Sequence, residues 1–271
     1  MTSDTILKTR VVPPIRLGSR RSRHVVERAL RVNRHTWKII FSGFFEPVFY
    51  LFSIGVGLGV LVGDVPGPGG MLISYEEFVA PALLASSAMN GAVFESTMNV
   101  FFKLKYDRLY DAMLATPLEP RDIAAGEIGF SLIRGGLYAI AFLVIVGVLG
   151  YATSPLAILA LPAALLIGLA FGAIGMAATT YMRTWQDFDM VTLVTMPLFL
   201  FSATFTPITE YPEAVQTIVK ISPLYHGTEL VRGFMLGVAD WSMVGHTAYL
   251  VVLGLIGMAI ANRRIEVLLK K

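Results

Sequence analysis

The sequence predicts an all-α polytopic membrane protein, and its composition and apolar runs are the observations that predict this class. Of its 271 residues, 55% are hydrophobic and only 15% are charged, whereas a soluble domain is about 25% charged. Several apolar runs exceed the roughly 20 residues that a helix needs to cross a bilayer. Because cysteine is absent, disulfides and thiolate metal sites are excluded.

The apolar runs divide the chain into six predicted transmembrane helices. Each has about 20 or more residues with few charges. They lie at 39–62, 77–102, 126–150, 155–182, 187–208 and 241–262. The transmembrane domain therefore covers 39–262, with a basic arm at 1–38 before it and a basic tail at 263–271 after it.

Lysine and arginine predict the orientation of these helices. The arm at 1–38 is strongly basic, and the loop between the second and third spans holds Lys103, Lys105, Arg108 and Arg121. The connections on the opposite side hold only Lys220 and Arg232. The positive-inside rule then places both termini in the cytoplasm. The arm lacks an early apolar core, so no cleavable signal is expected.

Residues 21–38 are predicted to form an amphipathic helix at the membrane surface. At about 100° per residue, one side carries Val25, Val26, Ala29, Leu30, Val32 and Trp37. The other side is basic, which suits the anionic cytoplasmic leaflet. The alternative is a disordered basic tail. In both cases the positive charge points to lipid, and no nucleic acid partner is expected.

The segment before the last span is predicted to form two short helices within 209–237, joined near Ser222–Pro223. It is too polar for a span, and each proline suits a helix start. We expect the pair to re-enter the outer leaflet and to gate a pathway, because irregular backbone at that depth must line protein or water. The residues assigned to this outer gate are Pro212, Pro223, His226, Glu229 and Arg232. Glu229 and Arg232 are spaced for a local ion pair.

Three predicted spans carry a charge, at Glu46, Glu95 and Arg134. Each lies on the order of 10 Å from the cytoplasmic end of its helix. An unpaired charge at that depth is costly, so we predict that Arg134 pairs with Glu46, Glu95 or both. The alternative is that each side chain reaches the interface separately.

The charged stretch at 103–127 offers a surface on which a soluble partner can act. A partner is needed because the chain has no G-x-x-x-x-G-K-[ST] motif for ATP and no G-x-S-x-G motif for a hydrolase. No His/Asp/Glu cluster has the spacing of a metal site, so His226 and His246 are interpreted as packing residues.

Four blocks of sequence together resemble the permeases of type-2 ATP-binding-cassette (ABC-2) exporters. The blocks are EPVFYLFSIGVGLG (46–59), YEEFVAPALLASSAMNGAVFES (75–96), YDAMLATPLEPRDIAAGEI (110–128) and FSATFTPITEYPEAVQTIVKISPLYHGTELVRGFMLG (201–237). The resemblance covers about 40–270 in the same order, and it is most similar to the nodulation-factor, or lipo-oligosaccharide, exporter branch.

The resemblance implies a permease dimer above two cytoplasmic P-loop ATPase subunits, which would bind ATP and magnesium. This chain would itself hold no cofactor and would not be an enzyme. The second permease would be the same chain or a similar paralogue. Residues 21–38 would be the connecting helix, 103–119 would hold the coupling helix, and 182–189 would form a smaller contact. The implied coupling residues are Lys103, Lys105, Tyr106, Arg108, Leu109, Tyr110, Asp111, Leu114 and Pro117.

The resemblance implies export of an amphiphile, with a lipid-linked saccharide or glycolipid as the expected substrate. A multidrug or antibiotic exporter permease is the first alternative. An ion-gradient-driven transporter, with the three charges as a relay, is disfavoured because no inverted repeat is visible. An intramembrane enzyme is disfavoured by the missing catalytic motifs.

Overall fold

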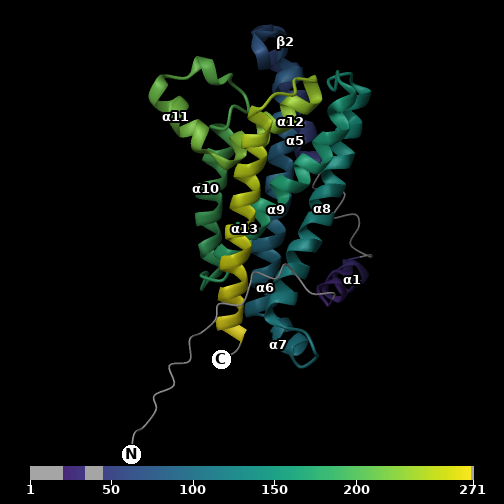
Figure 1. Cartoon of the computed structure of the whole chain (residues 1–271), viewed down its shortest axis with the longest axis vertical. Helices are drawn as coiled ribbons and strands as arrows, with labels where there is room; N and C mark the ends of the chain where they lie inside the picture. The colour runs from purple at the N-terminus through teal and green to yellow at the C-terminus, as the bar shows by residue number, and fades with distance from the viewer. Residues whose placement is uncertain (1–20, 34–44, 270–271) are drawn as a thin grey trace, which may run out of the picture.

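The computed structural model describes residues 21–33 and 45–269. Long helices run side by side along the length of the molecule (Figure 1). Within the described residues, 5 helices are long and apolar enough to cross a membrane. They are Phe45–Val62, Tyr75–Lys105, Pro120–Val148, Pro155–Thr179 and Ser242–Leu269. These helices match five of the six predicted spans; residues 34–44, including the predicted start of the first span, lie outside the described part.

Each of the first two spanning helices contains a π-helical turn. The first consists of α3 (Phe45–Tyr50), η1 (Leu51–Val56) and α4 (Gly57–Val62). The second consists of α5 (Tyr75–Phe94), η3 (Glu95–Asn99) and α6 (Val100–Lys105). A π-turn adds a residue to the helix and is frequent at functional sites.

A short hairpin between these helices departs from the all-α prediction. Its elements are β1 (Asp64–Pro66), the turn η2 (Pro68–Gly70) and β2 (Leu72–Ser74), and the two strands pair antiparallel. Gly69 and Gly70 have φ values of 69° and 78°, which glycine adopts at little cost. α5 then begins at a capping box, in which the backbone nitrogens of Ser74 and Glu77 each donate to the side chain of the other residue.

The core of the bundle is formed where α9 contacts α5, α8 and α13. The spanning helices here are α8 (Pro120–Val148), η4 (Pro155–Leu159) with α9 (Ala160–Thr179), and α13 (Ser242–Leu269). A Cβ atom at Gly257 would lie 2.8 Å from the backbone nitrogen of Ile174. Such close contact between backbones is how helices associate in lipid.

The predicted span at 187–208 is shorter in the structure and is not confirmed as a crossing. After η5 (Trp185–Asp187), the helix α10 covers Phe188–Leu200, 13 residues, or about 20 Å. The chain then becomes irregular, and Ala203 has a φ of 53°. Side chains distant in sequence satisfy this backbone: Arg232 Nη2 donates to Ala203 O at 2.8 Å, and the Tyr75 hydroxyl donates to Phe205 O at 3.1 Å.

The segment before the last span forms the two predicted short helices. They are α11 (Glu213–Ile221) and α12 (Pro223–Leu236), preceded by the turn η6 (Ile208–Glu210). The junction lies at Ser222–Pro223, as predicted. α12 packs against α5, α9 and α13, and it lies at the end of the molecule that carries the hairpin (Figure 1).

The opposite end of the molecule carries α1 (Ser22–Asn33) and α7 (Leu109–Leu114) (Figure 1). The described part of the predicted 21–38 helix is therefore helical. α1 packs on α8, where a Cβ atom at Gly126 would lie 2.4 Å from Val25 Cβ. The basic residues of α1 and those beside α7, which are far apart in sequence, thus lie at the same end of the molecule.

Candidate functional site

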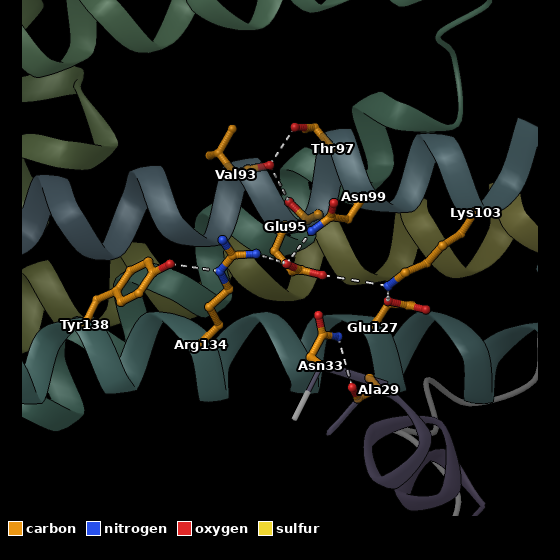
Figure 2. A network of polar contacts seen from close by, with 11 residues as sticks. Ala29, Asn33, Val93, Glu95, Thr97, Asn99, Lys103, Glu127, Arg134 and Tyr138 are labelled. Atoms are coloured by element: carbon orange, nitrogen blue, oxygen red, sulfur yellow. Dashed lines mark hydrogen bonds and ion pairs between the residues drawn. The ribbon is translucent and has the colours of Figure 1, made fainter. Parts of the chain in front are cut away.

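Glu95 is the centre of a buried polar network (Figure 2). It begins the π-turn η3 and is 1% exposed. Its Oε2 accepts hydrogen bonds from Arg134 Nη1 at 2.7 Å and from Asn99 Nδ2 at 2.6 Å. The predicted pairing of Arg134 with Glu95 is therefore present, and it removes the need for either charge to reach the interface alone.

Lys103 joins a second acid to this network. Its Nζ lies 2.6 Å from Glu127 Oε2 and 3.7 Å from Glu95 Oε1. Lys103 was predicted to lie on the surface that meets an ATPase, whereas its side chain turns into the bundle. Glu127 was missed, although it is nearly fully buried. The two acids and two bases balance, as burial in a membrane requires.

The π-turn explains how the four charges come into register. On α8, Arg134 follows Glu127 by seven residues, which returns a side chain to the same face of an α-helix. On the facing helix, Lys103 follows Glu95 by eight residues, and eight would normally rotate it by about 80°. The extra residue in η3 corrects this rotation. The sequence spacings alone, seven on α8 and eight on the facing helix, do not align the four charges, so Glu127 could not be found from them.

Arg134 also reaches a cleft of about 530 Å³ between α3, α5, α8 and α10. Its Nε donates to the Tyr138 hydroxyl at 3.1 Å, and its guanidinium lies 5.5 Å from the centre of the Phe94 ring. The lining mixes aromatic, hydroxyl and amide side chains, among them Tyr50, Ser87, Asn90, Thr195 and Phe199. Such a lining suits a ligand with both apolar and hydroxyl groups.

Glu46 lies in the same cleft but not in the network. It is exposed and lines the α3 side. Among the described residues, no ion pair joins Glu46 to Arg134, so the structure supports only the Glu95 half of the predicted pairing. The two acids approach Arg134 from different helices, and Glu95 is the one within hydrogen-bond distance.

The predicted coupling residues divide into exposed and buried groups in the structure. The exposed ones are Lys105, Tyr106, Arg108, Asp111 and Pro117. Leu109 and Leu114 are half-buried, and Tyr110 is 1% exposed. Arg21 on the α1 side donates from Nη1 to Pro117 O at 2.8 Å, beside a groove of about 640 Å³ between α1 and α7. The loop between α7 and α8 is therefore tied to the start of α1.

Tyr110 points from α7 toward the ion-pair network. Its buried hydroxyl has no hydrogen-bond partner among the described residues. Burial, and next the negative charge of Glu127, raise the pKa of Tyr110 well above its usual value. The hydroxyl therefore stays protonated, and Glu127 is the acid that affects it most.

The second predicted cytoplasmic contact, at 182–189, is a capped turn. The Asp187 carboxylate accepts from the backbone nitrogens of Arg183 at 2.6 Å and of Thr184 at 3.1 Å. These bonds lower the pKa of Asp187, because they favour its charged form. The turn leads directly into α10, one wall of the cleft.

The outer-gate residues lie on α11 and α12 or at their starts. Glu229 and Arg232 form the predicted ion pair. Arg232 does more than predicted, because it is 2% exposed and donates to the carbonyls of Phe78 and Ala203. Pro212 and Pro223 precede or begin α11 and α12. Arg232 thus fixes α12 to α5 and to the irregular segment after α10.

His226 contacts His246 of α13, with 2.7 Å between their Nδ1 atoms. The Tyr249 ring stacks on His226 with 4.0 Å between ring centres, and its hydroxyl donates to Ile221 O. No group of three or more possible metal ligands exists in the described part of the chain. The pair therefore forms a polar contact between α12 and α13.

Comparison with known proteins identifies the family. Residues 22–236 match the model of the ABC-2 type transporter family. The chain belongs to this family. Nodulation protein J of Rhizobium leguminosarum bv. viciae is 35% identical over 246 residues, which cover 87% of this chain and 93% of that protein. Nodulation protein J of Rhizobium meliloti is 32% identical over 213 residues, or 76% and 79% of the two chains.

A further relative carries a different name. The inner membrane transport permease YadH of Escherichia coli K12 is 26% identical over 210 residues, which cover 75% of this chain and 77% of that protein. As a member of the ABC-2 type transporter family, the chain is a multi-pass membrane protein and a transport component. The ATPase of such systems is a separate subunit, so the chain is not itself an enzyme.

Proposed function

We propose that the chain is the permease subunit of an ABC exporter that moves an amphiphile, a lipid-linked saccharide or glycolipid, out of the cell. The observation that carries this proposal is the cleft between α3, α5, α8 and α10 together with the ion-pair network behind it. The cleft offers aromatic and hydroxyl side chains to cargo. The network connects Arg134 in the cleft to Lys103, at the end of the helix that leads into α7.

The topology that we propose has six crossings in a bacterial plasma membrane, with both termini in the cytoplasm. α10 and the irregular segment at 201–207 would together form the fifth crossing in chain order. α11 and α12 would re-enter the outer leaflet and close the exit. The support for this depth is that Arg232 and Tyr75 satisfy the irregular carbonyls, as a lipid environment demands.

The complex that we propose contains two permease chains and two cytoplasmic P-loop ATPases, which bind ATP and magnesium. The second permease is another copy of this chain or a paralogue. The exposed residues on and beside α7 would meet the ATPase, and the ion-pair network would transmit their movement. Support comes from the family, whose permeases work with ATPase subunits.

A multidrug or antibiotic exporter permease is the second candidate function. The observation that favours it is the largely aromatic and apolar cleft wall, which would also accept a drug-sized amphiphile. The ion-gradient transporter is disfavoured because two of its three relay charges, Glu95 and Arg134, are paired with each other. Glu46 would then be left as a single carboxylate, and a relay needs a series of groups that bind and release an ion.

Purification of the tagged chain in mild detergent, with partners identified by mass, tests the proposal. Recovery of a P-loop ATPase in about equal amount is the expected result. The purified complex in vesicles should then move a fluorescent glycolipid only with ATP and magnesium. Transport that follows an imposed proton or sodium gradient without ATP would contradict the proposal. Comparison of a glycolipid with a drug-like amphiphile separates the two exporter functions.

A further inference from the structure

The charges of the cleft define the cargo that it accepts, an inference that rests on the transport function proposed above. Arg134 is the cation in the described lining, and its charge is already used. Nη1 donates to Glu95, Nε donates to Tyr138, and the Phe94 ring lies beside the guanidinium. An incoming anion would have to compete with Glu95, whose carboxylate already offsets the charge of this guanidinium.

Glu46 supplies the charge that remains in the cleft. It is exposed in the lining, and no described residue forms an ion pair with it. The Glu95 carboxylate, in contrast, is 1% exposed and bonded to Arg134 and Asn99. The described lining therefore presents one uncompensated negative charge to a ligand, opposite to what a phosphate requires.

The other polar groups of the lining are neutral. Ser87, Asn90 and Thr195 offer hydroxyl and amide groups from α5 and α10. Tyr50 of α3 packs against Phe199 of α10, with 5.5 Å between ring centres, and these rings form an apolar wall. This combination can bind hydroxyl and amide groups while it packs against the apolar face of a sugar ring or an acyl chain.

We propose that the cargo has an uncharged or cationic head group with hydroxyl or amide substituents, and that Glu46 rejects anionic head groups. A glycolipid without phosphate, or one with an amino sugar, fits this cleft. A saccharide joined to its lipid by phosphate or pyrophosphate does not. Glu46 is therefore a specificity-determining residue, separate from the ion-pair network that Glu95 and Arg134 form.

Three fluorescent amphiphiles test this proposal in the purified permease–ATPase complex. They share one acyl chain and carry a neutral sugar, an amino sugar or a sugar phosphate. Fluorescence anisotropy should show that the phosphate probe binds about tenfold more weakly than the neutral one, the size expected for one carboxylate near a charged group. The amino sugar should bind at least as tightly as the neutral probe.

Substitution of Glu46 separates specificity from folding. Glu46→Gln should make the three affinities similar, and Glu46→Lys should favour the phosphate probe. Asp64→Lys, an exposed charge reversal in β1 outside the cleft lining, should keep the wild-type order. The size-exclusion profile of each variant reports on folding, and Glu46→Gln, which keeps the shape of the side chain, tests the proposal if Glu46→Lys misfolds.

Equal binding of all three probes by the wild type would overturn the proposal, and so would an unchanged order in Glu46→Gln. Failure of the wild type to bind any probe would also overturn it, because the cleft would then not be a head-group site. These results are distinct from failure of the proposed function, which would appear as absence of ATP-dependent transport. A complex that exports all three probes equally with ATP would keep the function and reject the charge selection.

Discussion

At the scale of single residues, the Arg134–Glu95 pair should show strong energetic coupling. Arg134→Gln leaves the buried Glu95 with Asn99 and a more distant Lys103, and Glu95→Gln leaves Arg134 without its acid. Loss of one partner of a buried pair costs about 3–5 kcal/mol. The double variant should lose less than the sum of the singles, with a coupling of about 1–3 kcal/mol. Thermal unfolding in detergent measures this coupling.

The control for this cycle is Lys220→Gln, because Lys220 is exposed on α11 and should change stability by less than about 0.5 kcal/mol. Strictly additive losses for Arg134→Gln and Glu95→Gln would show that the two side chains do not stabilise each other. The charge reversal Arg134→Glu with Glu95→Arg should recover part of the stability that each single reversal loses.

Removal of the Tyr110 hydroxyl is expected to change stability less than removal of a hydrogen-bonded tyrosine hydroxyl. Its hydroxyl has no partner among the described residues, so Tyr110→Phe should leave stability unchanged or raise it by about 1 kcal/mol. The matched control is Tyr138→Phe, which removes the acceptor of the Arg134 Nε hydrogen bond and should cost about 1 kcal/mol. A loss in Tyr110→Phe as large as that in Tyr138→Phe would show that the Tyr110 hydroxyl is bonded.

Sequence alone predicted part of this network, and the limit is geometric. Glu95 and Arg134 were predicted as a pair because two opposite charges at one depth need each other. Lys103 was assigned to the surface because it lies in a charged stretch. The π-turn that brings Lys103 into line with Glu127 is a local change in helix geometry, and the residue types of η3 do not predict it.

At the scale of elements, the contact between α12 and α13 should weaken in acid. The Nδ1 atoms of His226 and His246 face each other at 2.7 Å, so one must carry a proton and the other must not. Burial, and next the neighbouring His246, lower the pKa of His226. Protonation of both imidazoles makes two N–H groups oppose each other across this short contact.

The sign of this pH dependence follows from the depressed pKa of His226. The separated helices bind a proton near the usual pKa of about 6.5, and the packed helices resist it, so the contact loses stability as pH falls below that value. Amide hydrogen exchange of α12 should accelerate between about pH 6.5 and pH 5. His226→Asn with His246→Asn should abolish this pH dependence. Tyr249→Phe, which keeps both imidazoles, should preserve it.

The helix α10 shows where element boundaries could not be predicted. Residues 187–208 are apolar enough for a full span. Pro197 does not mark the end of the helix, because α10 continues past it to Leu200. The irregular segment that follows depends on hydrogen bonds from Arg232 and Tyr75. Those partners lie 29 and 130 residues away in sequence, and sequence periodicity reports only on near neighbours.

At the scale of the whole molecule, the bilayer and the charge distribution made much of the architecture predictable. Five of the predicted spans are present, because hydrocarbon thickness fixes how long an apolar helix must be. The short outer helices and their junction at Ser222–Pro223 were also predicted, since prolines mark helix starts. The cleft was not predicted, because it combines residues from five elements, α3, α5, η3, α8 and α10, that meet only after the bundle has packed.

Two kinds of variant should separate ATPase docking from the transmission of movement through the molecule. Asp111→Arg changes an exposed position on α7 and should weaken the binding of the ATPase subunit. Glu127→Gln changes a residue that is 2% exposed and bonded to Lys103. This variant should bind the ATPase normally and hydrolyse ATP, yet move less cargo for each ATP, because Lys103 then loses its nearest acid.

The measurements are ATPase recovery in a pull-down, and the ratio of cargo moved to ATP hydrolysed in vesicles. Asp240→Asn, which changes an exposed acid in the connection between α12 and α13, is the control for loss of a carboxylate. A normal transport ratio in Glu127→Gln would show that movement passes through another contact, and the packing of α1 on Gly126 would be the next place to test. Loss of ATPase binding in Glu127→Gln would show that the network holds the shape of the docking loop instead of transmitting its movement.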